Sequence, residues 1–211
     1  MTQVTIFGAG NMARGIGTRL ATGGHQIQVL APTGEHAEAL ASELGGAASG
    51  DSASSVMTGE VVVLAVPYDA ALEIATRRGA DLAGKVVVDI TNPVDWASFD
   101  RLVTPPDSSA AEEIASRLPA GVPVVKAFNT TFAGTLVSGA VAGETLDVLL
   151  AADDDAARET VAKLVTDGGM RPVNAGPLRR AQQLEHLGFL HMAVQDALGT
   201  SQSSAVKFVT P

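Results

Sequence analysis

Two apolar runs near the middle of the chain constrain the fold more than any other feature of the sequence. Residues 61–66 and 86–90 are apolar at nearly every position instead of at alternate positions. A strand of this kind needs cover on both faces, which a parallel sheet receives from helices on its two sides. The sequence therefore predicts a parallel sheet between two layers of helices.

The rest of the first 150 residues fits the same pattern. Met12, Ile16 and Leu20 recur at every fourth position before Gly23-Gly24, and Ala70 and Ile74 begin a second stripe of helical period. Further short apolar runs, each expected to form a strand, occupy residues 4–7, 27–30, 122–125 and 146–150. Strands that alternate with helices predict a doubly wound α/β fold.

A glycine-rich motif directly follows the first predicted strand and opens the first predicted helix. Residues 8–13 read GAGNMA, the G-x-G-x-x-A pattern of dinucleotide-binding turns. Gly8 permits a tight turn, Gly10 lets the backbone approach a diphosphate, and the helix N-terminus attracts the anion. The motif predicts a Rossmann domain, although a glycine turn that serves packing alone is the alternative. The expected cofactor contacts here are Gly8, Ala9, Gly10, Asn11 and Met12.

The end of the second predicted strand bears on the choice between NAD and NADP. NAD usually meets a carboxylate there, whereas NADP meets a donor or a cation. No carboxylate follows Leu30 directly; Thr33 can donate to a phosphate while capping the next helix, and Arg14 and His36 are the nearby cations. These residues favour NADP(H), with Thr33 and Arg14 as contacts, while Glu35 supports the NAD alternative.

Three later loops are expected at the same edge of the sheet, because ligands of open parallel sheets bind at the carboxyl ends of the strands. They occupy residues 66–68, 90–96 and 127–131 and are rich in amides and hydroxyls. Such loops suit a planar heterocycle that carries an amide, although Asn-Pro turns and helix caps explain single asparagines equally well. The expected cofactor contacts from these loops are Val66, Pro67, Asn92, Pro93, Ala127 and Asn129.

The pattern changes after residue 150. Asp153-Asp154-Asp155 predicts the N-terminus of a helix that runs to Gly168-Gly169, and a cap is favoured over a metal site there. Apolar residues spaced three and four apart predict a long helix over 178–198 whose apolar seam needs a partner. We therefore divide the chain into a dinucleotide-binding Rossmann domain, residues 1–152, and a small C-terminal helical domain, residues 153–211, which is expected to form a homodimer.

Composition excludes several classes of protein. The 46% of hydrophobic residues and 18% of charged residues exclude intrinsic disorder, and the net charge of −9 argues against binding to nucleic acid or anionic membranes. The absence of cysteine removes disulfides and thiolate chemistry. No apolar run is long enough to span a membrane and no leader precedes the first strand, so a cytoplasmic protein that acts on a small molecule is expected.

No catalytic constellation is visible in the sequence. There is no nucleophile elbow and no HExxH, and the four histidines are not at metal-ligand spacing. His191 lies on an apolar seam and is interpreted as a core histidine, with acid–base catalysis as the alternative. Lys126 is interpreted as partnering solvent or a carboxylate, with a general-acid role as the alternative. We predict no catalytic side chain and no metal site.

Several segments, taken in order along the chain, resemble the NADPH-dependent deazaflavin (coenzyme F420) reductases. The resemblance implies that a nicotinamide lies against the three loops above and that a deazaflavin occupies a cleft closed by the last helix. Direct hydride transfer between two aligned rings needs little help from acids or bases. The resembling segments are residues 8–15 (GAGNMARG), 92–96 (NPVDW), 108–113 (SSAAEE), 126–130 (KAFNT) and 176–178 (GPL). The substrate contacts that the resemblance implies are Val94, Thr130, Leu187 and His191.

These observations predict an oxidoreductase that transfers a hydride between NADP(H) and coenzyme F420. One alternative is an NADP-dependent reductase of an imine or pyrroline, because GxGNMA motifs also open pyrroline-5-carboxylate reductases. The other is a non-catalytic dinucleotide sensor, which would bind NADPH without turnover.

Overall fold

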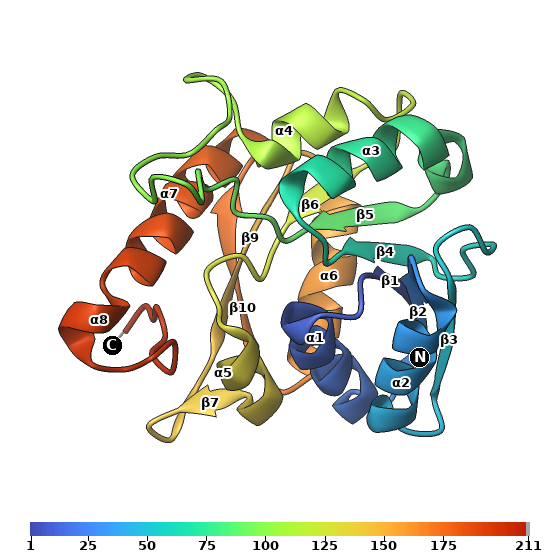
Figure 1. Ribbon diagram of the computed structural model, residues 1–211, viewed down its shortest axis with the longest axis horizontal. Coiled ribbons are helices and arrows are strands. Elements are labelled where there is room, and N and C mark those ends of the chain that lie inside the picture. Colours follow the sequence, from blue (N-terminus) through green and yellow to red (C-terminus); the bar gives the residue numbers. More distant parts are fainter. Residues whose placement is uncertain (210–211) are drawn as a thin grey trace.

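An eight-stranded sheet forms the middle layer of the computed structural model, which describes residues 1–209 (Figure 1). Its strands are β1 (Gln3–Phe7), β2 (Gln26–Ala31), β3 (Ala48–Ser52), β4 (Val61–Leu64), β5 (Val86–Asp89), β6 (Val124–Lys126), β9 (Asp147–Ala152) and β10 (Arg171–Gly176). A separate two-stranded sheet pairs β7 (Ala140–Val141) with β8 (Glu144–Thr145).

Helices cover the two faces of the large sheet. On one face, side chains of α1, α2, α5 and α6 share a single apolar core with the sheet, and on the other face α3, α4 and the start of α7 share a second core. The helices are α1 (Asn11–Thr22), α2 (Gly34–Leu44), α3 (Tyr68–Arg78), α4 (Ala110–Ala115), α5 (Ala133–Ser138), α6 (Asp155–Asp167), α7 (Ala181–Ala193) and α8 (Gln195–Leu198), with short 3-10 helices η1 (Gly79–Leu82) and η2 (Leu178–Arg180).

The strand order confirms the predicted doubly wound α/β fold. Read from its other edge, the sheet runs β3-β2-β1-β4-β5-β6-β9-β10. Strands β1 to β6 thus have the 3-2-1-4-5-6 order of dinucleotide-binding sheets, and they are all parallel. The sheet is not wholly parallel, however, because β9 pairs with β6 in the antiparallel sense and β10 runs parallel to β9.

Strand β4 shows why the middle runs are continuously apolar. Val61 and Val63 belong to the core under α1 and α2, whereas Val62 and Leu64 belong to the core under α3. Successive side chains of a strand point to opposite faces, so each position of β4 is buried against one helix layer or the other. All four side chains are at most 2% exposed.

The six predicted strands all occur, but the sequence did not predict β3. Its residues, ASGDS, lack the β-branched and aromatic side chains typical of strands. The strand forms because its backbone pairs with β2 and because Gly50 lets α2 approach closely. A Cβ atom at Gly50 would lie 2.3 Å from the backbone nitrogen of Glu38. Tertiary packing therefore decides the structure of this segment.

The predicted boundary at residue 152 falls inside the sheet layers. Helix α6 begins as expected after Asp154, whose carboxylate accepts a hydrogen bond from the Ala157 amide at 2.8 Å, and it packs against the sheet. Strand β10 then pairs with β9. The segment from residue 153 to residue 176 thus extends the sheet, which the sequence did not predict, and within residues 1–209 only helices and irregular segments follow β10. The predicted long helix of residues 178–198 is divided into η2, α7 and α8.

No helix within residues 1–209 combines the length and apolar character needed to cross a membrane. The homodimer, the cytoplasmic location and the lack of nucleic-acid binding stay predictions.

The close approach of α2 to β3 can be tested by adding a single methyl group. Gly50→Ala places a Cβ atom against the backbone of Ala37 and Glu38, so we expect it to lower the free energy of unfolding by about 1–3 kcal/mol in urea titrations. Gly46→Ala is the matched control in the preceding turn, because a Cβ atom there meets nothing within 4 Å. Equal stability of the two variants would show that β3 does not depend on this contact.

Candidate functional site

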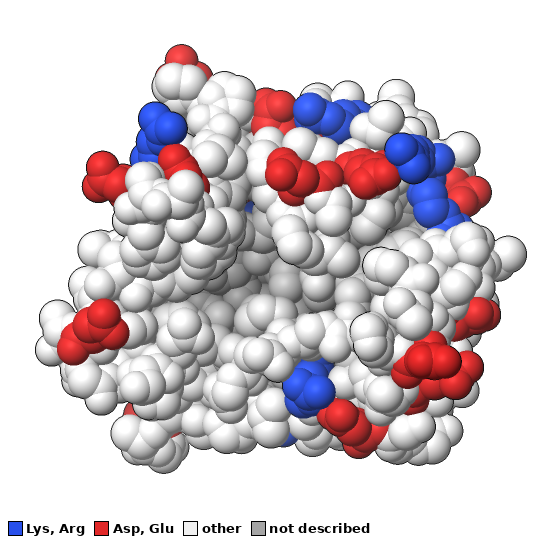
Figure 2. Space-filling view, viewed as in Figure 1, with Lys and Arg blue, Asp and Glu red and all other residues white. Residues whose placement is uncertain are grey.

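A cleft of about 630 Å³ opens at the carboxyl ends of β1, β4, β5 and β6. Strand order reverses between β1 and β4, the position at which open α/β sheets bind ligands. Figure 2 shows a hollow near the centre of this face whose lining is almost free of Lys, Arg, Asp and Glu. Among the described residues that line the cleft, Asp69 is the one residue of these four types, and His191 adds an ionisable imidazole.

The glycine turn has the geometry of a diphosphate site. Gly8 has φ +109°, and a Cβ atom at this position would lie 2.2 Å from the carbonyl oxygen of Ala65, so only glycine fits between β1 and β4. At Gly10, by contrast, a Cβ atom meets nothing within 4 Å, and the space beside it belongs to the cleft. The first turn of α1 carries no acidic residue, which leaves its amide groups available to an anion.

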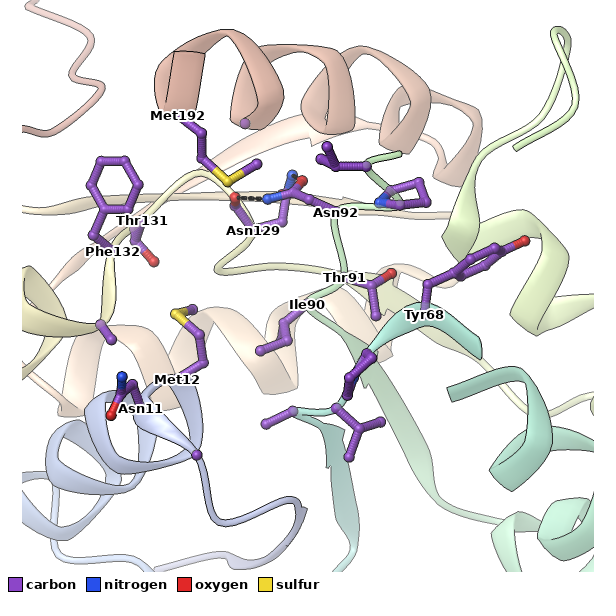
Figure 3. Close-up of a pocket in the computed structure, with 18 of the residues that line it drawn as sticks. Asn11, Met12, Tyr68, Ile90, Thr91, Asn92, Asn129, Thr131, Phe132 and Met192 are labelled. Carbon is purple, nitrogen blue, oxygen red and sulfur yellow. Dashed lines mark hydrogen bonds between the residues drawn. The ribbon is translucent and has the colours of Figure 1, made fainter. Parts of the chain in front are cut away.

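Two asparagines form a reciprocal pair in the cleft. Asn92 Nδ2 donates to the Asn129 carbonyl oxygen at 2.7 Å, and Asn129 Nδ2 donates to Asn92 Oδ1 at 2.9 Å and to the Leu184 carbonyl at 2.8 Å (Figure 3). Helix α7 lies directly against the pair, because a Cβ atom at Gly188 would be 2.7 Å from Asn92 Oδ1. The pair thus joins the loops after β5 and β6 to α7.

Two buried polar atoms of the cleft have no hydrogen-bond partner among the described residues. They are Thr91 Oγ1 and Asn129 Oδ1, on side chains that belong to residues only 4% and 3% exposed. Unpaired buried polar atoms are costly, and ligands or water commonly satisfy them. A carboxamide NH₂ supplies donors of the kind that both atoms accept. The residues present therefore fit the nicotinamide end of a dinucleotide.

A fully buried ion cluster lies behind this part of the cleft. Lys126 Nζ donates to Asp89 Oδ2 at 2.8 Å, to Glu185 Oε1 at 2.8 Å and to the Thr91 carbonyl at 2.5 Å. Burial alone would lower the pKa of Lys126, but the two carboxylates outweigh it and raise that pKa above its ordinary value. For Glu185, burial raises the pKa, and the nearby ammonium of Lys126 only partly counteracts this effect. Lys126 partners carboxylates and does not line the cleft, so the general-acid alternative finds no support.

His191 is held by hydrogen bonds on both ring nitrogens. The Thr130 carbonyl lies 3.1 Å from Nδ1 and can only accept, so Nδ1 carries the proton and Nε2 accepts from the Ser204 hydroxyl at 2.8 Å. Burial lowers the pKa of His191, which favours the neutral imidazole. Its ring also packs against Phe132 with a centroid separation of 4.4 Å. These contacts agree with the interpretation as a core histidine, although one edge reaches the cleft.

The structure brings most of the predicted site residues together. The predicted contacts that line the cleft are Gly10, Asn11, Met12, Val66, Pro67, Asn92, Pro93, Val94, Asn129, Thr130 and His191. Gly8, Ala9 and Ala127 lie just beneath it, where Gly8 shapes the turn, Ala9 packs on the core and Ala127 is fully buried. The binding roles of all these residues stay predictions.

Three predicted contacts lie elsewhere. Leu187, expected to contact substrate, packs instead with Leu184 in a small apolar cluster. Arg14 Nε is paired with Glu43 Oε2 at 2.6 Å, at the partly exposed outer side of α1. Thr33 stands at the N-cap position of α2, but its side chain makes no capping hydrogen bond, contrary to expectation.

The sequence analysis did not single out several residues that line the cleft. Met192 of α7 points into it from the side opposite the predicted contact Met12 of α1 (Figure 3). Phe132, Trp96 and Gln202 also contribute to its lining. The backbone conformation of Phe128 also marks this part of the cleft as a candidate functional site, because Phe128 has φ +59° just before Asn129. No group of three or more potential metal ligands occurs within residues 1–209.

Comparison with known proteins shows similarity to one family. A family model described as NADP oxidoreductase coenzyme F420-dependent matches residues 3–93, which include the glycine turn and the loop after β4. The F420-dependent NADP reductase of Methanothermobacter marburgensis is 29% identical over 202 residues, with 89% of each chain covered. The predicted resemblance to the F420-dependent NADP oxidoreductases is confirmed.

Two other proteins are similar to this chain, one in part of its sequence and one in its fold. Metalloreductase STEAP3 of Rattus norvegicus is 31% identical over 186 residues, but this chain spans only 36% of that protein. A solved structure from Arthrobacter sp. FB24 matches with a TM-score of 0.85 and full coverage of both chains at 24% identity. That similarity supports the fold, including the C-terminal helices that the family model does not reach.

Removal of the buried cation should be strongly destabilising. Lys126→Met leaves Asp89 and Glu185 buried without their partner, so we expect the free energy of unfolding to fall by about 3–5 kcal/mol. Without the ammonium, the pKa of Glu185 in the folded state rises further above its unfolded value. A carboxyl group whose pKa is higher in the folded state than in the unfolded state stabilises the fold while it is protonated, below its unfolded pKa. This contribution to the free energy of unfolding is lost as the pH rises through the folded-state pKa. The deficit should therefore be smaller at pH 5 than at pH 8.

Lys163→Met is the matched control for this substitution, because Lys163 forms an exposed ion pair with Asp167 on α6. We expect its urea-unfolding curve to remain close to that of the unsubstituted protein at both pH values. If Lys126→Met behaved in the same way, the buried cluster would not be a structural requirement.

Proposed function

We propose that this protein transfers a hydride between NADP(H) and the deazaflavin coenzyme F420. The observation that carries the proposal is the glycine turn at the β1–β4 reversal, which opens directly into a nearly uncharged cleft with unpaired buried acceptors. The family-model match over residues 3–93 supports it, as does the relative named as an F420-dependent NADP reductase, which matches over 89% of each chain.

The cleft suits a reaction that depends on alignment more than on acid–base chemistry. When bound, the nicotinamide and the deazaflavin would supply the hydride donor and acceptor. The chain's own contribution would be to hold flat rings in alignment between Met12 and Met192, which lie on opposite sides of the cleft. Burial lowers the pKa of His191, and both of its nitrogens are hydrogen-bonded within the protein, so no proton transfer is assigned to it.

The two halves of the cofactor would meet different parts of the chain. The turn residues Gly8, Ala9 and Gly10 with the first amides of α1 would hold the diphosphate. Asn129 and Thr91 would accept hydrogen bonds from the carboxamide. At the other end, Thr33 and Arg14 are proposed to hold the 2′-phosphate; the Thr33 hydroxyl is not used as a cap, and the Arg14 guanidinium stays partly exposed beside Glu43.

Substitution at Gly10 separates binding from folding. Gly10→Val keeps a backbone conformation that valine tolerates, φ −84° and ψ −172°, and a Cβ atom there meets nothing within 4 Å, so the added side chain would occupy the space proposed for the diphosphate. We expect NADPH affinity to fall about 100-fold with an unchanged melting temperature, measured by calorimetry and by thermal unfolding.

Two further variants complete this comparison. Gly46→Val, in an open turn distant from the cleft, should change neither quantity, whereas Gly8→Ala should destabilise the fold because of its clash with Ala65. Undiminished NADPH binding by Gly10→Val would place the diphosphate elsewhere.

The proposed activity is tested by supplying acceptors one at a time. Purified protein is mixed with NADPH and, separately, with coenzyme F420, free flavin and pyrroline-5-carboxylate, while NADPH absorbance is followed. We expect rapid oxidation with coenzyme F420 and slow or no oxidation with the others. Turnover only with pyrroline-5-carboxylate would support the imine-reductase alternative, and NADPH binding without any turnover would support a sensor.

A further inference from the structure

An aromatic patch lies at the mouth of the cleft. It consists of Trp96 and Phe99, from the loop after β5, and Phe189 of α7. The ring centroids of Trp96 and Phe99 are 5.9 Å apart, and Phe99 meets Phe189 edge to face at 5.4 Å. Trp96 is the chain's one tryptophan, lines the cleft and is 70% exposed. A large, exposed aromatic side chain at the rim of a cavity is typical of a surface that meets a ligand or a partner.

The loop that presents the aromatic patch is held in a defined shape. Asp95 Oδ1 accepts hydrogen bonds from the amides of Ala97 and Ser98 at 3.2 and 3.4 Å, and Asp95 Oδ2 pairs with Arg101 Nε at 3.1 Å. Residues 94 and 102 form an antiparallel bridge across the base of the loop. Phe99 adopts φ +50°, a conformation that costs free energy for a non-glycine residue. The Asp95 contacts and the Phe99–Phe189 packing therefore hold the backbone of the loop that carries Trp96.

The aromatic patch is too far along the sheet to belong to the diphosphate site. Strand β5, which leads into the loop, lies two strands from β1 in the sheet order, or about 10 Å away at ~4.8 Å per strand. The Asn92–Asn129 pair and Met192 lie on the same side of the cleft as the aromatic patch, since they belong to the loops after β5 and β6 and to α7. The hollow is nearly free of charged side chains (Figure 2), which favours an uncharged ring over a charged group.

We propose that Trp96 is the stacking surface for the flat heteroaromatic ring of the second substrate, the ring that exchanges a hydride with the nicotinamide. The assignment rests on the proposed function for the identity of that ring. Indole offers a wide apolar face without charge, and ring-on-ring stacking tolerates different substituents. Trp96 thereby determines which class of acceptor binds, and the diphosphate turn determines the dinucleotide.

The test measures two dissociation constants in three variants, by calorimetry and without turnover. Coenzyme F420 or FMN is titrated into protein saturated with NADP⁺, and NADP⁺ is titrated separately. We expect Trp96→Ala to weaken coenzyme F420 binding about 10- to 100-fold, and Trp96→Phe to restore most of the loss. NADP⁺ affinity and melting temperature should stay as in the unsubstituted protein. Leu198→Ala is the control, since Leu198 is 57% exposed on α8 and does not line the cleft.

The possible outcomes separate this assignment from the proposed function. Unchanged coenzyme F420 affinity in Trp96→Ala would overturn the stacking role. If that variant also lost a dimeric state seen for the unsubstituted protein, the aromatic patch would be a subunit contact instead. If the unsubstituted protein bound FMN but not coenzyme F420, the proposed function would be wrong. Loss of FMN binding in Trp96→Ala would then still support the stacking surface, while failure to bind either ring would overturn both.

Discussion

The ammonium group of Lys126 donates its three protons to groups from β5, from the loop after β5 and from α7, and the position of α7 depends on this contact. Two carboxyl groups share one cation there. The backbone amides of Ala110 and Ala111, at the start of α4, supply further donors to Glu185 at 3.0 and 3.4 Å. With Glu185 fixed, α7 brings Gly188 against Asn92 and His191 against Thr130, which forms the side of the cleft opposite α1.

The parts of this arrangement that are local in sequence could be predicted, and the parts that depend on distant pairs could not. The runs at 61–66 and 86–90 predict buried parallel strands because their apolar pattern is itself the requirement of that position. The glycine turn is equally local. Lys126, however, meets Glu185 across 59 residues, and the Asn92–Asn129 pair forms across 37. Nothing in the spacing of these residues specifies their partners; packing of α7 on the sheet does.

The chain is acidic overall, with a net charge of −9, yet its cleft is nearly uncharged. Apart from Asp69 in its lining, the charged groups behind and beside the cleft are engaged with one another: Lys126 with Asp89 and Glu185, and Arg101 with Asp95. A nearly uncharged cleft places few ionised side chains against a bound ring. Stacking and amide hydrogen bonds are then the main means of recognition. This electrostatic character agrees with the absence of a catalytic constellation in the sequence, because hydride transfer between stacked rings depends on distance and alignment.

Several residues with a strained backbone conformation lie around the cleft. Within residues 1–209 the non-glycine residues with positive φ are Phe99, Phe128, Ala142, Ser201 and Gln202. Ala142 serves the β7–β8 turn, whereas Phe99, Phe128 and Gln202 each adjoin the cleft. Hydrogen bonds hold these conformations: the Phe128 carbonyl accepts from Thr131 Oγ1 at 2.7 Å, and the Gln202 amide donates to Gln195 Oε1 at 3.1 Å. Strain persists only where the surroundings over-determine the geometry. A cleft built at this cost is formed before its ligands bind, which a reaction that relies on alignment requires.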